Sequence, residues 1–137
     1  MLIRLAARTY GIGLDSVREI IPFRRATRLP GTDVQVAGLV NVRGTIVTVI
    51  DLGARLDEGA GAAASREGGS MVLIEHGAKL VGVLVDEVLD VRKLTDVELG
   101  TDAAALVPGG AVRAVGRLDG QIVALLDIHD IISQVLT

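Results

Sequence analysis

The sequence predicts an all-β protein, and three observations carry that prediction. Apolar residues occur in short runs separated by glycine-containing turns, which is typical of short strands rather than of long amphipathic helices. Several of these runs are apolar at nearly every position, so both faces of their strands must be covered, as in a closed barrel or in two barrels packed together. Only one segment, near residue 130, has the spacing of a substantial helix.

Four hairpins are expected along the chain. Their arms are residues 2–7 and 9–14, 36–42 and 45–50, 71–75 and 80–85, and 112–118 and 121–126. The second hairpin is expected to turn at Arg43-Gly44 and the third at His76-Gly77. The fourth is the clearest, because Asp119-Gly120 between its arms tolerates the positive φ angles of a tight turn.

Helical structure is expected in three places. Residues 127–136 place apolar side chains at i, i+3, i+4 and i+7, and Asp127 is positioned to cap this helix. Shorter helical turns are expected at residues 15–20 and 52–56. The glycine- and alanine-rich residues 58–69 predict a surface loop within one domain of residues 1–137, and residues 92–110 predict an irregular connection.

The composition excludes several classes of function. Without cysteine the chain has no disulfide, thiolate nucleophile or cysteine metal site. Its apolar runs are far shorter than the ~18–20 residues of a membrane span, so a cytoplasmic protein without membrane insertion is expected. One Phe, one Tyr and a net charge of −3 oppose nucleic-acid binding. The charge is unevenly distributed, since residues 1–56 carry eight basic and four acidic residues and the remainder six and thirteen.

Four aspartates at strand ends offer the best material for an enzyme: Asp15, Asp51, Asp86 and Asp127. Carboxylates in such positions can act as acid and base, so a small hydrolase is one alternative hypothesis. An Asp directly before a turn or helix more often accepts hydrogen bonds from free backbone N–H groups, and capping is therefore the preferred interpretation. Asp51-Leu52-Gly53 lacks the Thr or Ser that would follow the Asp in an aspartic protease.

Other motifs for cofactors and metals are incomplete. His76 and His129 have no partner at metal-ligand spacing and are interpreted as surface residues. Residues 11–16 form a Gly-x-Gly without the third glycine of a dinucleotide-binding turn. A second alternative is an RNA-binding barrel that uses Arg24, Arg25 and Arg28, although these read more simply as a solvated loop. No catalytic residue, cofactor or metal site is therefore expected.

The residues from Val36 to Leu52 read V-A-G-L-V-N-V-R-G-T-I-V-T-V-I-D-L. This stretch resembles the signature of CheW domains, roughly V-x-G-L-x-N-L-R-G-x-I-x-P-V-I-D-L; Val42 replaces the usual Leu and Thr48 a common Pro. Further matches follow in the family's order and extend the resemblance over nearly the whole chain: Tyr10-Gly11-Ile12, Val17-Arg18-Glu19-Ile20, Leu29-Pro30, residues 81–88 and Leu125-Leu126-Asp127-Ile128.

The resemblance implies a fold and a binding function. The fold would be two packed five-stranded SH3-like β-barrels with short helical turns and a C-terminal helix. The function would be that of a non-catalytic cytoplasmic adaptor in a chemotaxis-like signalling array. One surface would bind the cytoplasmic tip of a chemoreceptor, and another the regulatory domain of a CheA-type histidine kinase.

The resemblance also points to site residues. It assigns Val17, Glu19, Gly38 and Arg43 to the receptor-facing surface and the region of Leu84, Val85, Asp86 and Val88 to the kinase-facing one. Simpler interpretations stand beside these assignments. Arg43 would otherwise be an ordinary turn arginine, and Gly38 and Gly44 would serve backbone geometry. Val17, Leu84 and Val85 would otherwise be core residues.

Overall fold

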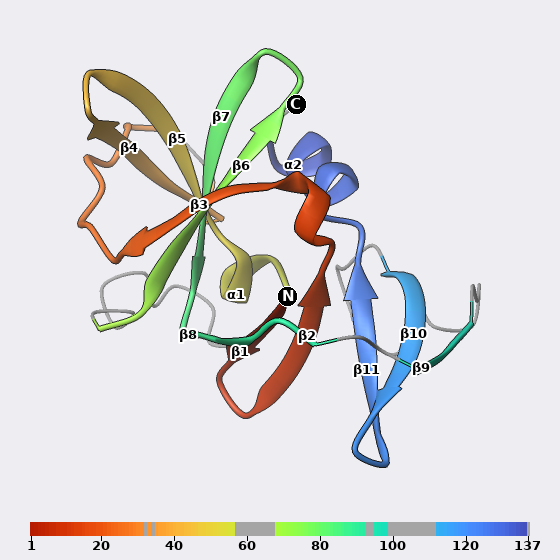
Figure 1. Cartoon of the computed structure of the whole chain (residues 1–137). Helices are drawn as coiled ribbons and strands as arrows, with labels where there is room; N and C mark the ends of the chain where they lie inside the picture. Colours follow the sequence, from red (N-terminus) through yellow and green to blue (C-terminus); the bar gives the residue numbers. More distant parts are fainter. Residues whose placement is uncertain (32, 34, 57–67, 93–94, 99–111, 137) are drawn as a thin grey trace.

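A computed structural model describes residues 1–31, 33, 35–56, 68–92, 95–98 and 112–136. The described residues are mainly strands with short helices (Figure 1). The strands are β1 Leu2–Leu5, β2 Arg8–Ile12, β3 Val17–Pro22, β4 Val36–Val42, β5 Thr45–Asp51, β6 Ser70–His76, β7 Lys79–Val85, β8 Glu87–Asp90, β9 Thr95–Glu98, β10 Val112–Leu118 and β11 Gln121–Leu126. The helices are η1 Leu14–Ser16, α1 Leu52–Arg55 and α2 Ile128–Leu136. The all-β prediction with a C-terminal helix is confirmed.

The strands form two sheets. Sheet A has the order β8-β1-β2-β11-β10-β9, and sheet B has the order β3-β6-β7-β5-β4. Within sheet A, β2 and β11 run parallel with Tyr10 opposite Ala124, so segments from the two ends of the sequence lie side by side. Sheet B has the five strands expected from the resemblance, whereas sheet A has six because β8 and β9 extend it at its two edges.

Sheet B closes on itself through the segment that follows β3. Thr27 and Leu39 exchange two backbone hydrogen bonds of 2.8 and 2.9 Å, which join this segment to the edge strand β4. The two edges of the sheet are thereby brought together around a common apolar centre. This arrangement agrees with the expected barrel and leaves fewer exposed edge groups than an open sheet.

Two apolar clusters share the strands of sheet B. Cluster 1 contains Met1, Ile3, Leu5, Tyr10, Ile12, Ile50, Leu52, Leu56, Val72, Ile74, Val81, Val83, Val85, Ala124, Leu126, Ile128, Ile131 and Ile132. Cluster 2 contains Ile21, Ala37, Val40, Val42, Val47, Val49, Met71, Leu73 and Leu84. Successive residues of β6 and β7 point alternately into the two clusters. Both faces of these strands are therefore covered, which explains their nearly continuous apolar sequences.

The four predicted hairpins are confirmed, but two turns are shifted. In the first hairpin Leu5 pairs with Arg8, so the turn lies at Ala6-Ala7 rather than at residue 8, and the second arm ends at Ile12 rather than at residue 14. Arg43 and Gly44 have φ angles of 49° and 86°, and Asp119 and Gly120 have 50° and 81°, as a tight hairpin requires. In the third hairpin His76 still belongs to β6 and pairs with Lys79, so the turn lies at Gly77-Ala78 rather than at His76-Gly77.

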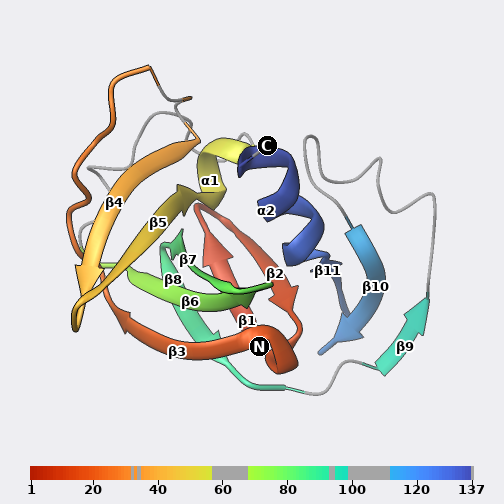
Figure 2. The same ribbon diagram turned by 90° about the horizontal axis from the view of Figure 1, so that it is seen from above.

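The helix predictions have mixed outcomes. Asp127 Oδ1 accepts a 3.1 Å hydrogen bond from the Asp130 N–H, and Asp51 Oδ1 accepts one of 3.2 Å from the Ala54 N–H, so both caps are confirmed. Figure 2 shows α2 beside β11 and close to α1, to which a contact between Arg55 and Gln134 joins it. Within the described ranges, no helix combines the length and apolar character needed to cross a bilayer.

Two expectations were wrong at the level of local structure. The helical turn at residues 15–20 is limited to η1, because residues 17–22 pair with β6 and form strand β3. The irregular connection at 92–110 contains strand β9, which pairs with β10. The rest of that connection and nearly all of the loop at 58–69 lie outside the described residues.

Candidate protein-binding surface

The β4–β5 turn presents Arg43 at the tip of a fixed loop. Asn41 Oδ1 accepts a 2.8 Å hydrogen bond from the Gly44 N–H, which holds the turn from within. Arg43 occupies the left-handed region and remains exposed. The side chain therefore starts from a defined backbone position while its guanidinium stays accessible to solvent.

Arg43 forms an ion pair with Glu19 of β3. The Arg43 Nη2 donates to Glu19 Oε2, and the two side chains are 66% and 35% exposed. The hydrogen bond from Arg43 lowers the pKa of Glu19 below its ordinary value, and the same contact raises the pKa of Arg43. Both groups therefore carry full charge at neutral pH. The fold brings these two residues together although they lie 24 positions apart in the sequence.

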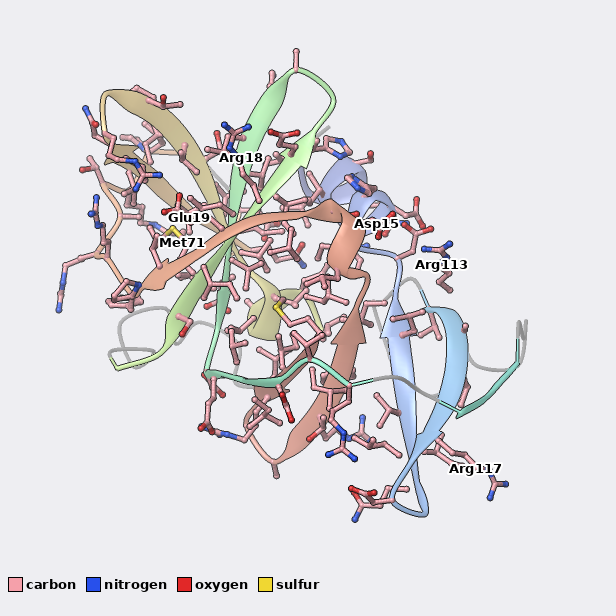
Figure 3. All side chains as sticks on the ribbon, viewed as in Figure 1. Asp15, Arg18, Glu19, Met71, Arg113 and Arg117 are labelled. Atoms are coloured by element: carbon pink, nitrogen blue, oxygen red, sulfur yellow. The ribbon has the colours of Figure 1, made fainter. Side chains whose placement is uncertain are left out.

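A second ion pair lies next to the first. Arg18 of β3 donates to Glu75 of β6, and Figure 3 shows Arg18 and Glu19 projecting from the same strand. A groove of about 470 Å³ is lined by Arg18, Val42, Arg43, Thr45, Glu75, Gly77, Ala78, Lys79 and Leu80. Sequence reasoning missed Arg18 and Glu75 as part of this surface, because their proximity depends on the register between β3 and β6.

Val17 and Gly38 occupy less exposed positions. Val17 is half-buried and packs against cluster 1. Gly38 is buried with a φ angle of 138°, and a Cβ atom there would lie 2.2 Å from the Thr27 carbonyl oxygen. The absence of a side chain at Gly38 therefore lets the segment after β3 approach β4, so its direct structural role is to shape the barrel edge.

The residues expected on the kinase-facing surface differ in accessibility. Leu84 is 1% exposed and belongs to cluster 2, and Val85 is 0% exposed and belongs to cluster 1. Asp86 and Val88 are half-buried; Asp86 Oδ2 accepts a hydrogen bond from the Ala6 N–H, and Val88 packs against cluster 1. Leu84 and Val85 present no side chain to a partner in this structure.

Exposed apolar residues lie just beyond this region. Leu89 and Val91 are 42% and 58% exposed, and Leu14 is 51% exposed. Leu14 and Val91 contribute to a mainly apolar groove of about 280 Å³, whose lining is Met1, Leu2, Gly11, Ile12, Gly13, Leu14, Val91, Arg92 and Leu125. Their sequence context gave no signal, because an apolar residue beside a strand reads equally well as core.

Three of the four strand-end aspartates serve the backbone. Asp51, Asp86 and Asp127 each accept a hydrogen bond from a main-chain N–H, at α1, at the β1–β2 turn and at α2 respectively. Asp15 is exposed on η1. These separate roles do not favour the hydrolase alternative.

The sequence predicted His76 and His129 to be isolated surface residues, and this prediction was wrong. Both are half-buried, and their Nδ1 atoms lie 3.0 Å apart. A separation of 53 residues concealed the contact, because β6 and α2 meet only in the folded chain. In the part of the chain that the structure describes, no three His, Cys, Asp or Glu side chains are grouped so as to hold a metal ion.

Comparisons with known proteins agree with this fold. The family model for the CheW-like domain matches residues 1–136. The chemotaxis protein CheW of Klebsiella aerogenes is 28% identical over 135 residues, which cover 97% of this chain and 80% of that protein. Protein PilI of Pseudomonas aeruginosa is 30% identical over 89 residues, which cover 65% of this chain and 49% of that protein.

A solved structure supports the same assignment at the level of fold. The crystal structure of the scaffolding protein TtCheW from Thermoanaerobacter tengcongensis superposes with a TM-score of 0.82 over 95% of this chain and 84% of that protein, at 22% identity. Since the family model spans nearly every residue and the strands follow the same architecture, this chain belongs to the CheW-like domain family.

Proposed function

We propose that this protein is a non-catalytic cytoplasmic adaptor that couples chemoreceptors to a CheA-type histidine kinase at receptor arrays. The observation that carries the proposal is the exposed ion pair between Glu19 of β3 and Arg43, whose turn lies within the stretch that resembles the family signature. The chemotaxis proteins among its relatives support the pathway.

The Arg43–Glu19 pair suits exchange with a partner. An ion pair this exposed contributes little to the stability of the fold, because solvent screens both charges. The planar guanidinium forms bidentate hydrogen bonds with carboxylates, so Arg43 is able to pair with an acidic group of a receptor tip in place of Glu19.

We propose that the kinase regulatory domain binds at the other sheet, in the region that contains Asp86 and Val88. The exposed neighbours Leu89 and Val91 would supply the apolar contacts, and the buried Leu84 and Val85 would support the backbone beneath them. Arg43 belongs to sheet B and β8 is an edge strand of sheet A (Figure 1). Separate surfaces would allow one molecule to hold both partners at once.

The direct test is a calorimetric titration of the protein with a soluble receptor-tip fragment and, separately, with the regulatory domain of a CheA-type kinase. We expect saturable binding to both. Arg43→Glu should weaken binding to the receptor tip by about tenfold or more, because it removes a charged hydrogen bond and adds a repulsive carboxylate. Arg117→Glu on β10 is the matched charge reversal on the other sheet and should leave that affinity unchanged. Absence of binding to either partner would refute the proposal.

A further inference from the structure

A chain of four polar side chains joins three elements that are distant in sequence. Ser16 Oγ of η1 lies 2.8 Å from His129 Nε2 of α2, and His129 Nδ1 lies 3.0 Å from His76 Nδ1 at the end of β6. The other ring nitrogen of His76, Nε2, lies 3.3 Å from Ser133 Oγ of α2. All four nitrogens of the two imidazole rings therefore have a hydrogen-bonding partner.

The geometry of the two rings defines how they interact. Their planes differ by 20°, and their centroids are 5.3 Å apart while the two Nδ1 atoms are 3.0 Å apart. The difference between these distances is about two ring radii, so both Nδ1 atoms lie near the line that joins the centroids. The rings consequently meet edge to edge and nearly coplanar, with each Nδ1 directed at the other. This is the arrangement of a linear N–H···N hydrogen bond.

Such a bond holds one proton and only one. A neutral imidazole carries a proton on one ring nitrogen and a lone pair on the other, so the Nδ1 of one ring donates while the Nδ1 of the other accepts. The serine hydroxyls are able to accept from or donate to the two Nε2 atoms, which lets the neutral pair satisfy every group. One added proton is also accommodated, at the Nε2 of the ring whose Nδ1 donates. A second added proton would direct two N–H groups at each other.

We propose that His76 and His129 form a proton-dependent latch, which is closed while one Nδ1 is unprotonated and opens when both rings are fully protonated. When it opens, the direct hydrogen bond between the His76 and His129 rings is lost, which removes a polar link between the β6–β7 hairpin and α2, while each Nε2–H still donates to its serine hydroxyl.

The charged groups on the elements that meet here are Asp15 on η1, Arg18 on β3, Glu75 on β6, Lys79 on β7, Asp127 directly before α2 and Asp130 on α2. Arg18 pairs with Glu75, while Asp127 caps the N–H of Asp130 and Asp130 accepts from Gln134. Lys79 stands opposite His76 in the β6–β7 ladder. Among the described residues, no carboxylate is hydrogen-bonded to either imidazole, so no fixed acceptor stands ready to stabilise the doubly protonated pair.

The latch also reaches the candidate receptor-facing strand. Ser16 directly precedes Val17, and β3 continues to Glu19. Movement of the His129 ring when the latch opens would therefore be transmitted through Ser16 to the beginning of β3. Regulation of binding through this strand rests on the proposed function, whereas the latch itself does not and is testable on the protein alone.

The chain contains only two histidines, so ¹⁵N spectra of the imidazole nitrogens show this pair without interference. Above pH 8 we expect opposite tautomers in the two rings, one Nδ1–H and one Nε2–H, with a scalar coupling between the two Nδ1 nuclei. On acidification the rings should gain their protons in two separate steps. The second step should coincide with about tenfold faster hydrogen exchange of the α2 amides, after correction for intrinsic rates.

His129→Gln provides the matched variant, because an amide retains hydrogen-bonding capacity without a titrating ring. In this variant His76 should titrate in one step, and α2 should show no such acceleration. Identical Nε2–H tautomers in both rings of the unaltered protein, or protection of α2 that does not change through the second step, would overturn the proposal. The tautomer measurement needs no variant and stands even where a substitution impairs folding.

Discussion

The centre of sheet B and its rim differ in what their residues do. In the central parts of β6 and β7, residues 71–74 and 81–85, side chains on both faces are buried in cluster 1 or cluster 2. At the β4–β5 turn, Arg43 and Glu19 pair in solvent on a rigid backbone. Buried apolar contacts, which determine stability, therefore lie in the central strands of the sheet, and the exposed charges that we propose bind a partner lie at its rim. Substitutions at the centre should unfold the protein, and substitutions at the rim should change partners while leaving the fold intact.

The largest effect is expected at the centre, from Leu84→Ala. Removal of a fully buried leucine side chain leaves a cavity, and the free energy of unfolding should fall by about 2–5 kcal/mol. We further propose that residues 1–137 unfold as one unit, because cluster 1 draws side chains from both sheets. Tyr10, the single tyrosine, lies in sheet A, so its fluorescence and the far-UV circular dichroism should shift together in urea.

Leu89→Ala is the control for this experiment, since Leu89 is exposed on β8 and its loss should change the free energy of unfolding by no more than about 0.5 kcal/mol. A transition of Tyr10 that stays at the unaltered urea concentration in Leu84→Ala would show that the two sheets unfold independently.

Gly38→Ala should have the next largest effect. The positive φ angle and the close approach of Thr27 make any side chain costly there, and we expect a loss of about 2–3 kcal/mol in thermal or urea unfolding. Gly44→Ala is the matched control, because its φ angle is also positive but no atom lies within 4 Å of the added methyl group. It should cost only about 1 kcal/mol. If Gly38→Ala were fully stable yet failed to bind a receptor tip, Gly38 would instead be a direct contact.

Arg43→Glu should barely change stability, in contrast to both substitutions above. Solvent screens both the lost ion pair and the new repulsion with Glu19, so the free energy of unfolding should change much less than in Leu84→Ala or Gly38→Ala. The same variant should lose receptor affinity. It would then show that a residue at the rim affects binding without affecting stability. A large loss of stability would place Arg43 among the structural residues.

The smallest effect concerns the protonation of Glu19. Arg43 lowers the pKa of this carboxyl through a hydrogen bond, so the favourable contact exists above the ordinary carboxyl range and is lost as pH falls through the lowered pKa. In Arg43→Gln the pKa of Glu19 should rise toward its ordinary value, as measured by NMR titration of the side-chain carboxyl carbon. Arg18→Gln should raise it less, because Arg18 acts on Glu19 only through weaker charge attraction. Equal shifts in both variants would contradict the assigned hydrogen bond.

The strands that could be predicted from the sequence are those with apolar runs typical of buried strands and with a recognisable turn dipeptide beside them. The four hairpins were predictable because β-branched runs and dipeptides such as Arg43-Gly44 and Asp119-Gly120 depend on local backbone geometry. Strands β3, β8 and β9 were missed because their pairing depends on neighbours distant in sequence. A helical turn was predicted for residues 15–20, but Val17, Ile20 and Ile21 are β-branched and pair with β6.

In the candidate site too, features set by local sequence were predictable and contacts between distant segments were not. Arg43 was identifiable from its signature turn, whereas its pairing with Glu19 required the approach of β3 to the β4–β5 turn. The burial of Leu84 and Val85 could not be distinguished from exposure, since an apolar run covered on both faces gives no alternation to read. The contact between His76 and His129 left no sequence signal at all, because nothing local to either residue indicates the other.

The central claim is that one molecule holds a receptor and a kinase on different surfaces. Sedimentation velocity of a receptor-tip fragment mixed with a CheA-type regulatory domain, with and without this protein, tests that claim most directly. We predict a ternary complex that forms only when the protein is present and that Arg43→Glu disrupts while its binary complex with the kinase domain persists. Competition between the two partners for the protein, or no ternary complex at saturating concentrations, would contradict the account.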